Sequence, residues 1–211
     1  MELLKWFVDL VLHLDHHLVE LLRAYGSLVY VILFAIVFAE TGLVVTPFLP
    51  GDSLLFAAGA LAAVDTSGTL SAPLLSLLLV IAAVAGNTTN YHVGRWIGPP
   101  AFSGRYRLLK VEYLQRTEAF FQKYGPMTVV LSRFAPIIRT CAPFVAGIGR
   151  MPYARFQAYN LIGGLGWVLL FIWAGYFFGN IPVIKSHFGF VTIGIILVSL
   201  IPVAWVALKK K

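Results

Sequence analysis

Three segments of the chain are long and apolar enough to cross a lipid bilayer as single helices. A bilayer span needs about 20 mostly apolar residues, and residues 74–98, 156–180 and 188–208 meet this condition. Only 12% of the 211 residues are charged, whereas about 25% are charged in a typical soluble domain. The chain is therefore predicted to be an all-α polytopic membrane protein with one membrane domain, residues 1–211.

Two further apolar segments do not have the pattern of a simple span. Residues 27–64 are too long for one crossing, and residues 125–149 contain two arginines and three prolines. Proline removes a helical hydrogen bond, and broken backbone at membrane depth is tolerated only inside protein or beside a wet cavity. We therefore predict that both segments are re-entrant helical hairpins.

The basic residues predict how the chain is oriented. Six of them lie between residues 95 and 123, two more are Arg150 and Arg155, and three lysines end the chain. If residues 125–149 enter and leave the membrane on one side, all three groups share a side, and the positive-inside rule places that side in the cytoplasm. The amino terminus is then outside and the carboxyl terminus cytoplasmic.

Two segments are predicted to lie in the membrane surface rather than across it. Residues 1–26 place apolar and polar side chains on opposite faces of a helix, which is typical of an interfacial amphipathic helix. Residues 99–124 form a basic linker of similar pattern on the cytoplasmic side.

A weak internal repeat relates the two halves of the chain. Each unit is predicted to be one hairpin followed by one spanning helix, and the charge argument places the two hairpins on opposite membrane faces. The repeat is therefore expected to be inverted, an arrangement found in transporters. The matching positions are Glu40 and Arg133, Pro50 and Pro143, residues 56–59 and 144–147, and Gly94 with Gly98 against Gly175 with Gly179.

Four ionisable residues lie in the otherwise apolar hairpins. They are Glu40 and Asp52 in the first, and Arg133 and Arg139 in the second. Such residues are costly in a membrane, face the protein interior and mark a pathway. The carboxylates suit reversible protonation, and the arginines offer forks that match a phosphate. The alternative is two ion pairs that only hold the hairpins together.

Residues 86–95 are unusually polar for a predicted span. Asn87 and Asn90 share one side of a helix, and Tyr91 follows them. These three residues either line a cavity facing the hairpins or form hydrogen bonds between helices.

Several other functions are excluded or disfavoured by the sequence. The single cysteine, Cys141, excludes an internal disulfide and a cysteine-based zinc site, and we expect no metal and no cofactor. Despite the net charge of +7, no nucleic-acid motif is present. The chain has no Walker A sequence and no Gly-x-Ser-x-Gly elbow. A membrane lipid phosphatase needs a nucleophilic histidine at a position where this chain has Arg139. We therefore expect that the protein is not an enzyme.

Specific motifs resemble those of the DedA family of bacterial inner-membrane proteins, part of the wider SNARE-associated or VTT group. The resemblance covers nearly the whole chain. The motifs are Phe38-Ala39-Glu40-Thr41-Gly42, Thr46-Pro47-Phe48-Leu49-Pro50-Gly51-Asp52-Ser53, Arg133-Phe134-Ala135-Pro136-Ile137-Ile138-Arg139-Thr140, Ala142-Pro143-Phe144-Val145-Ala146-Gly147 and Ala174-Gly175-Tyr176-Phe177-Phe178-Gly179.

The resemblance implies two re-entrant hairpins that face each other and a role in envelope integrity that depends on the proton-motive force. It places the family's essential acids at Glu40 and Asp52 and its essential arginines at Arg133 and Arg139. The chain departs from the family at Asn87, where relatives commonly have aspartate, so an additional proton site there is in doubt.

The hairpin charges predict a transporter or flippase for an anionic phosphate lipid with protons as the coupling ion, and the resemblance to the family implies undecaprenyl phosphate as the substrate. Its partners are then a membrane lipid and protons, and its location is the bacterial inner membrane. Two alternatives stay open: a phospholipid scramblase that needs no ion gradient, and an envelope assembly factor whose charges are structural.

Overall fold

The structure of the protein is a computed structural model that describes residues 14–43, 51–103, 111–182, 184 and 194. Every regular element among these residues is a helix, as the predicted all-α class requires. The α-helices are α2 Leu14–Tyr25, α3 Val29–Gly42, α4 Gly51–Val64, α5 Ala72–Ile97, α6 Val111–Tyr124, α7 Thr128–Leu131, α8 Pro136–Ile148 and α9 Tyr153–Phe178. The 3-10 helices are η1 Gly26–Leu28, η2 Pro99–Ser103, η3 Gly125–Met127 and η4 Ser132–Phe134.

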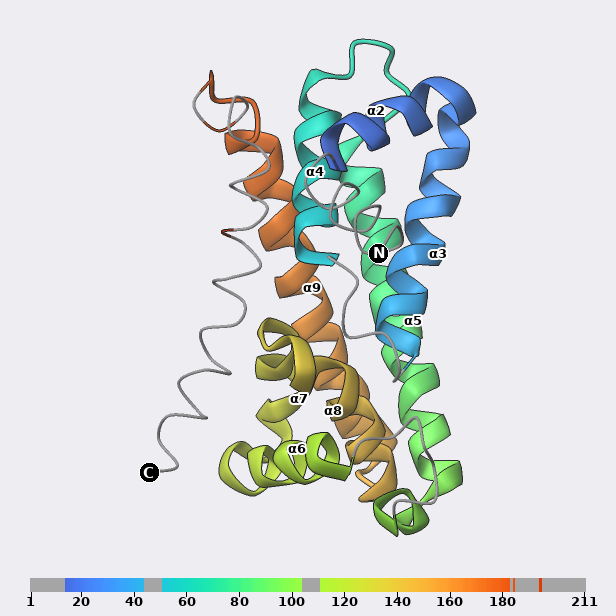
Figure 1. The fold of residues 1–211 in the computed structure, drawn as a ribbon, viewed down its shortest axis with the longest axis vertical. Helices are drawn as coiled ribbons and strands as arrows, with labels where there is room; N and C mark the ends of the chain where they lie inside the picture. Colours follow the sequence, from blue (N-terminus) through green and yellow to red (C-terminus); the bar gives the residue numbers. More distant parts are fainter. Residues whose placement is uncertain (1–13, 44–50, 104–110, 183, 185–193, 195–211) are drawn as a thin grey trace, which may run out of the picture.

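Two long helices, α5 and α9, run side by side along the length of the molecule (Figure 1). Each has 26 residues, or about 39 Å of helix, which exceeds the roughly 30 Å hydrocarbon core of a bilayer. Helix α5 ends at Ile97, and the next residue, Gly98, has a φ of +67°, which favours glycine. Helix α9 follows Pro152, which cannot donate a backbone hydrogen bond.

Three helical stretches within the described part of the chain are long and apolar enough to cross a membrane. They are His17–Gly42, Ala72–Ile97 and Tyr153–Phe178. The last two correspond to the predicted spans 74–98 and 156–180. The predicted span 188–208 lies outside the described residues except for residue 194.

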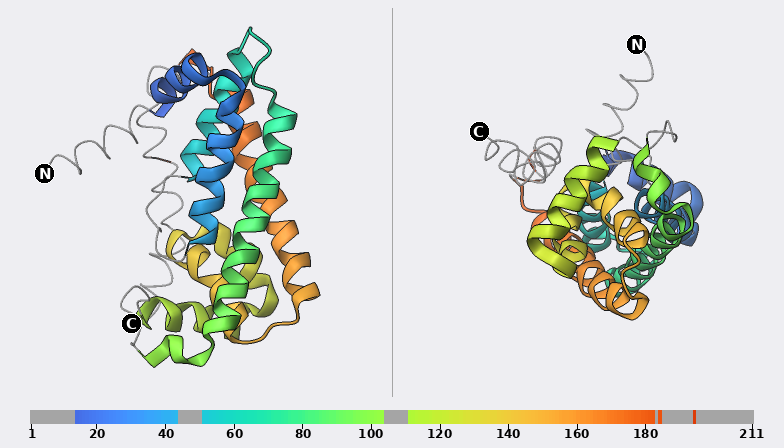
Figure 2. Two further views of the ribbon diagram at one scale, coloured as in Figure 1. Left: turned by 90° about the vertical axis from the view of Figure 1, so that its right-hand side faces the viewer. Right: turned by 90° about the horizontal axis from the view of Figure 1, so that it is seen from below.

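The first hairpin consists of α3 and α4. Both helices lie beside the same half of the long helices, α3 against α5 and α4 against α9 (Figures 1 and 2). Ahead of it, α2 is set at an angle across the end of the molecule, where Gly26 has a φ of +54° in the bend. Insertion of this hairpin as a re-entrant element stays a prediction.

The second hairpin consists of η3, α7, η4 and α8, and it lies beside the other half of the long helices (Figure 1). Here α7 packs against α9 and α8 packs against α5. Its helices are short, and the chain is interrupted at the extended Ala135, after which Pro136 begins α8. Pro143 lies inside α8 without ending it. Its insertion, and the inversion of the repeat, likewise stay predictions.

In the first hairpin, α4 crosses α9 through two glycines in close backbone contact. A Cβ atom at Gly59 would collide with the carbonyl oxygen of Ile172, and one at Gly175 would collide with the carbonyl oxygen of Phe56. Small residues of this kind let two helices approach closely in a membrane.

In the second hairpin, α8 crosses α5 in the same manner. A Cβ atom at Gly147 would collide with the carbonyl oxygen of Tyr91, and one at Gly94 with the carbonyl oxygen of Phe144. These four positions are those matched to Gly59, Ile172, Gly175 and Phe56 by the offsets of 88 and 81 residues in the sequence. Matched residues therefore make matched contacts in the two halves.

The predicted linker, residues 99–124, contains η2 and α6, while residues 104–110 lie outside the described part. Helix α6 lies across the end of the molecule where α5 ends and α9 begins (Figure 1). Exposed basic side chains share this end: Arg95, Arg116, Lys123, Arg150 and Arg155. We call it the basic end. Its cytoplasmic location stays a prediction.

The turn between α4 and α5 is closed at the opposite end by Asp65. Its carboxylate accepts hydrogen bonds from the Ser67 hydroxyl at 2.5 Å and from the Leu70 backbone N–H at 2.7 Å. These donors hold the pKa of the Asp65 carboxyl below its usual value.

Candidate functional site

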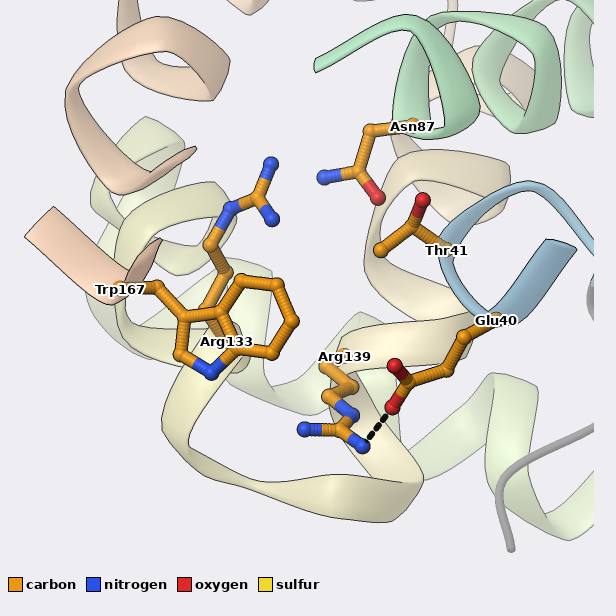
Figure 3. Close-up of a pocket in the computed structure, with 6 residues that line it drawn as sticks. All are labelled: Glu40, Thr41, Asn87, Arg133, Arg139 and Trp167. Carbon is orange, nitrogen blue, oxygen red and sulfur yellow. Dashed lines mark hydrogen bonds and ion pairs between the residues drawn. The ribbon is translucent and has the colours of Figure 1, made fainter. Parts of the chain in front are cut away.

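The four charged residues of the hairpins meet where the two hairpins face each other. Glu40 lies near the end of α3 and Asp52 near the start of α4, while Arg133 lies in η4 and Arg139 in α8. Figure 3 shows Glu40, Arg133 and Arg139 around one pocket, together with Thr41, Asn87 and Trp167. Residues almost 100 positions apart in the sequence are thus in contact.

Arg139 bridges to both carboxylates of the first hairpin. Its Nη2 donates to Oε1 of Glu40, and its Nη1 donates to Oδ1 of Asp52 at 2.7 Å. The side chains of Arg139 and Glu40 are only 10% and 1% exposed, so water screens this cluster weakly. The indole N–H of Trp167 donates to the same Asp52 oxygen at 2.8 Å. These charge-assisted bonds link the second hairpin to the first.

Arg133 has a different environment and is more deeply buried, at 3% exposed. In the described part of the chain it forms no ion pair with a carboxylate. Its Nη2 donates to Oδ1 of Asn160 at 2.8 Å and to the carbonyl oxygen of Ala83 at 3.3 Å. Its Nε has no hydrogen-bond partner there. Arg133 is therefore a fixed, buried cation whose Nε donor is unused.

Two glycines of α9 make room for the Arg133 guanidinium. A Cβ atom at Gly163 would lie 3.3 Å from Nε of Arg133, and one at Gly164 would lie 3.4 Å from Nη2. On another side, the Trp167 ring lies 5.7 Å from the Arg133 guanidinium carbon and 5.6 Å from that of Arg139. The indole thus contacts both cations, a favourable arrangement for each.

The three candidate cavity residues of α5 have different environments. Asn87 lines the pocket and donates to Oδ1 of Asn160 at 3.0 Å. Asn90 is fully buried and donates to the carbonyl oxygens of Thr41 at 3.3 Å and Thr140 at 2.8 Å, so it joins both hairpins to α5.

Tyr91 is not among the residues that line this pocket. Its hydroxyl donates to the carbonyl oxygen of Met151 at 2.5 Å, and its ring stacks on Phe156 at 4.4 Å. Its contacts are those of a core residue near the basic end.

The pocket has room for about one water molecule. It offers the donor of Arg133, the amide of Asn87, the hydroxyl of Thr41 and a Glu40 oxygen, Oε2, that lacks a partner in the described part of the chain. A phosphate is larger than one water molecule, so the pocket does not hold one in this arrangement. The described residues contain no group of three His, Cys, Asp or Glu side chains that would hold a metal ion.

Sequence reasoning missed Asn160 and Trp167, which both lie in α9. Asn160 is fully buried and contacts Arg133 and Asn87. A signal was available, because Asn160 is one of few polar residues in the predicted span 156–180 and precedes the pair Gly163-Gly164. For Trp167 no such signal exists, since tryptophan is common in spans.

Comparison with known proteins identifies the family. Residues 49–177 match the VTT domain. The chain is 51% identical to Protein DedA of Escherichia coli K12, over 96% of this chain and 92% of that protein. It is 40% identical to an uncharacterized membrane protein of Mycobacterium tuberculosis, over 84% of this chain and 78% of that one. It is 34% identical to the inner membrane protein YghB of E. coli K12, over 98% and 93%.

No solved structure matches the chain. The matched region contains Asp52, Asn87 and both hairpin arginines, and the identity to the E. coli protein extends over almost the entire length. The chain is therefore a membrane protein that belongs to the DedA family, whose shared unit is the VTT domain.

Proposed function

We propose that this protein moves an anionic phosphate lipid, with undecaprenyl phosphate as the substrate, across the bacterial cytoplasmic membrane in support of envelope integrity, and that protons bound at Glu40 and Asp52 drive it. The observation that carries the proposal is the contrast between the two arginines. Arg139 is neutralised by two carboxylates, whereas Arg133 is buried without one in the described part of the chain. A buried cation with an unused donor is suited to an anionic ligand.

Arg133 supplies the part of the proposed phosphate site that is already formed in the structure. Its Nη2 is held by Asn160 and its Nε lacks a partner in the described part of the chain. Because a guanidinium stays charged and planar, its position favours a phosphate oxygen placed beside Nε. Arg139 then supplies the second fork when it leaves the carboxylates.

Protons control that release. Protonation of Glu40 or Asp52 removes one of the two negative charges that hold Arg139. A neutral acid binds a guanidinium more weakly than a carboxylate does, so Arg139 turns to the phosphate. Binding of the headgroup and protonation of the acids therefore favour each other.

The orientation follows from the charges. The basic end lies in the cytoplasm by the positive-inside rule, which places the carboxyl terminus inside and the amino terminus outside. The first hairpin is then re-entrant from the outside and the second from the cytoplasm. Protons driven inward reach the acids of the first hairpin.

The test uses purified protein in liposomes that contain labelled undecaprenyl phosphate, with a pH difference across the membrane. We expect Arg133→Gln to abolish lipid binding and transfer. We expect Glu40→Gln to retain binding and to lose the dependence of transfer on the pH difference. The control is Arg116→Gln, which changes an exposed arginine of α6 and should leave transfer unchanged.

Three outcomes overturn all or part of the proposal. Equal transfer after neutralisation of all four charges would show that the site is not used. Undiminished transfer after collapse of the pH difference would indicate a scramblase. Retained cellular function with Glu40→Arg and Arg139→Glu together, which exchanges the two charges of one ion pair, would indicate an envelope assembly factor with structural charges.

A further inference from the structure

A row of polar side chains leads from Arg133 to the surface at the basic end. Asn160 accepts a hydrogen bond from Arg133, and its own amide nitrogen donates to Oε1 of Gln157 at 3.1 Å. The amide nitrogen of Gln157 donates to Oγ1 of Thr88 at 2.8 Å and to the hydroxyl of Tyr153 at 2.7 Å. We call Asn160, Gln157, Thr88 and Tyr153 the polar row.

The polar row becomes steadily more exposed away from Arg133. Asn160 is fully buried, Gln157 and Thr88 are half-buried, and Tyr153 is 44% exposed. Along α9, the seven residue steps from Asn160 to Tyr153 cover about 10 Å of helix. The row therefore joins the buried end of the site to the surface near the exposed Arg150 and Arg155.

The members from α9 lie on one face of that helix. Residues 153, 157, 160, 164 and 167 are spaced by three or four, so they share a side. The same side carries Gly164, which makes room for Arg133, and Trp167, which donates to Asp52. The exposed side of α9 carries apolar residues instead, among them Ile162 at 58% and Leu170 at 55% exposed.

Helix packing alone does not require such a row. Helices α5 and α9 need only small residues to pack closely in a membrane. Each polar side chain buried between them must be satisfied by hydrogen bonds. Four consecutive polar groups that end at the surface provide a path on which water and phosphate oxygens can replace one another.

We propose that the polar row is the hydrated route between Arg133 and the basic end, along which the phosphate headgroup passes between α5 and α9. This inference rests on the proposed function. Gln157 and Thr88 line the route, while Asn160 positions Arg133 at its inner end. In the structure the row is closed by its own hydrogen bonds, which the headgroup oxygens replace.

The test measures access of water to the row. Single cysteines are introduced as Thr88→Cys, Gln157→Cys and Tyr153→Cys. The buried Cys141 is replaced by alanine, so that only the introduced thiol can react. Each variant is treated in membrane vesicles with a charged thiol reagent that does not cross membranes. Ile162→Cys is the matched control, because Ile162 is more exposed than any member of the row but faces away from it. Each vesicle orientation is tested separately.

We expect Thr88→Cys and Gln157→Cys to react at least about tenfold faster than Ile162→Cys, because a thiol in lipid is not ionised to the reactive thiolate. The reaction should occur only from the side that carries the basic end, and added undecaprenyl phosphate should slow it. Labelling of Tyr153→Cys alone would overturn the route and show that the row only joins the helices.

A second pair of variants separates this inference from the proposed function. Gln157→Leu with Thr88→Val keeps Arg133 and all four hairpin charges. We expect it to retain lipid binding and to slow transfer about tenfold, as loss of a step outside the binding site does. Unchanged lipid transfer in this double variant would overturn the proposed route but not the proposed transport function. The transport function is tested separately by Arg133→Gln, which should lose transfer.

Discussion

The first hairpin and the second hairpin place matched glycines against the long helices at matched positions, yet they carry opposite charges. Gly59 of α4 packs against α9, and Gly147 of α8 packs against α5 in the same way. The acids belong to the first hairpin and the arginines to the second. The backbone contacts hold the hairpins in equivalent places, and the charges make the two places chemically different.

The two arginines differ in the same way. Arg139 reaches across to the first hairpin, whereas Arg133 bonds to α5 and α9. Of these two arginines, Arg139 therefore is the one that links the hairpins. This difference is the basis of our proposal that Arg139 stabilises the contact between the hairpins and that Arg133 binds a ligand.

The largest effect is expected from removing the arginine that links the hairpins. Arg139→Gln leaves two carboxylates buried without their cation, which costs about 3–5 kcal/mol of unfolding free energy. Arg133→Gln leaves no carboxylate unpaired in the described part of the chain, and the cost should be about 1–3 kcal/mol. Thermal unfolding in detergent measures both.

A rescue sharpens this prediction. Glu40→Gln with Asp52→Asn, added to Arg139→Gln, removes all the charge of the cluster and should recover most of the lost stability. Equal losses for the two single arginine variants, or no rescue, would contradict the difference between the arginines.

The next largest loss of stability is expected from filling the matched glycine contacts of the two hairpins. Gly94→Val and Gly175→Val each place side-chain atoms onto a backbone carbonyl oxygen, and each should cost about 3 kcal/mol. The control is Gly166→Val on α9, where no atom lies within 4 Å of the added Cβ. Unfolding in detergent should show equal losses at the two matched glycines and almost none at Gly166. Strongly unequal losses would break the comparison.

A smaller effect is expected at Trp167, which contacts both arginines. Trp167→Phe keeps an aromatic ring but removes the hydrogen bond to Asp52, so we expect a loss of about 2 kcal/mol. Trp173→Phe is the control, because Trp173 lies on the same helix and its ring lies against those of Tyr176 and Phe177. If both variants melt alike, Trp167 does not support the acid cluster.

The smallest effect is expected outside the hairpins. In α6, Arg116 donates to Glu112 at 2.6 Å, with side chains 45% and 66% exposed. Glu112→Gln should cost about 0.3–0.5 kcal/mol at low salt, as exposed pairs four residues apart do, and less at high salt. Melting temperatures at two salt concentrations measure it, with Glu118→Gln as the exposed control. A loss comparable to that of Arg139→Gln would remove the distinction between buried and exposed pairs.

Much of the architecture could be predicted because it depends on composition and local pattern. The length of apolar runs predicted helices at α5 and α9, since a bilayer requires about 20 apolar residues per span. Prolines predicted that the second hairpin is interrupted, and it is interrupted before Pro136, whereas Pro143 lies inside α8 without ending that helix. The four hairpin charges were predicted to be functional because placing a charge in a membrane segment is costly.

The pairing of those charges was decided by the tertiary structure alone. Sequence spacing cannot say that Arg139, and not Arg133, reaches Glu40 and Asp52, because their contact depends on how four helices cross. The roles of Asn160 and Trp167 have the same origin: each is an ordinary residue of a span until packing brings it to Arg133 or Asp52. Apolar pattern determines which segments are helices, and the close crossings at Gly59, Gly94, Gly147 and Gly175 determine which charges meet.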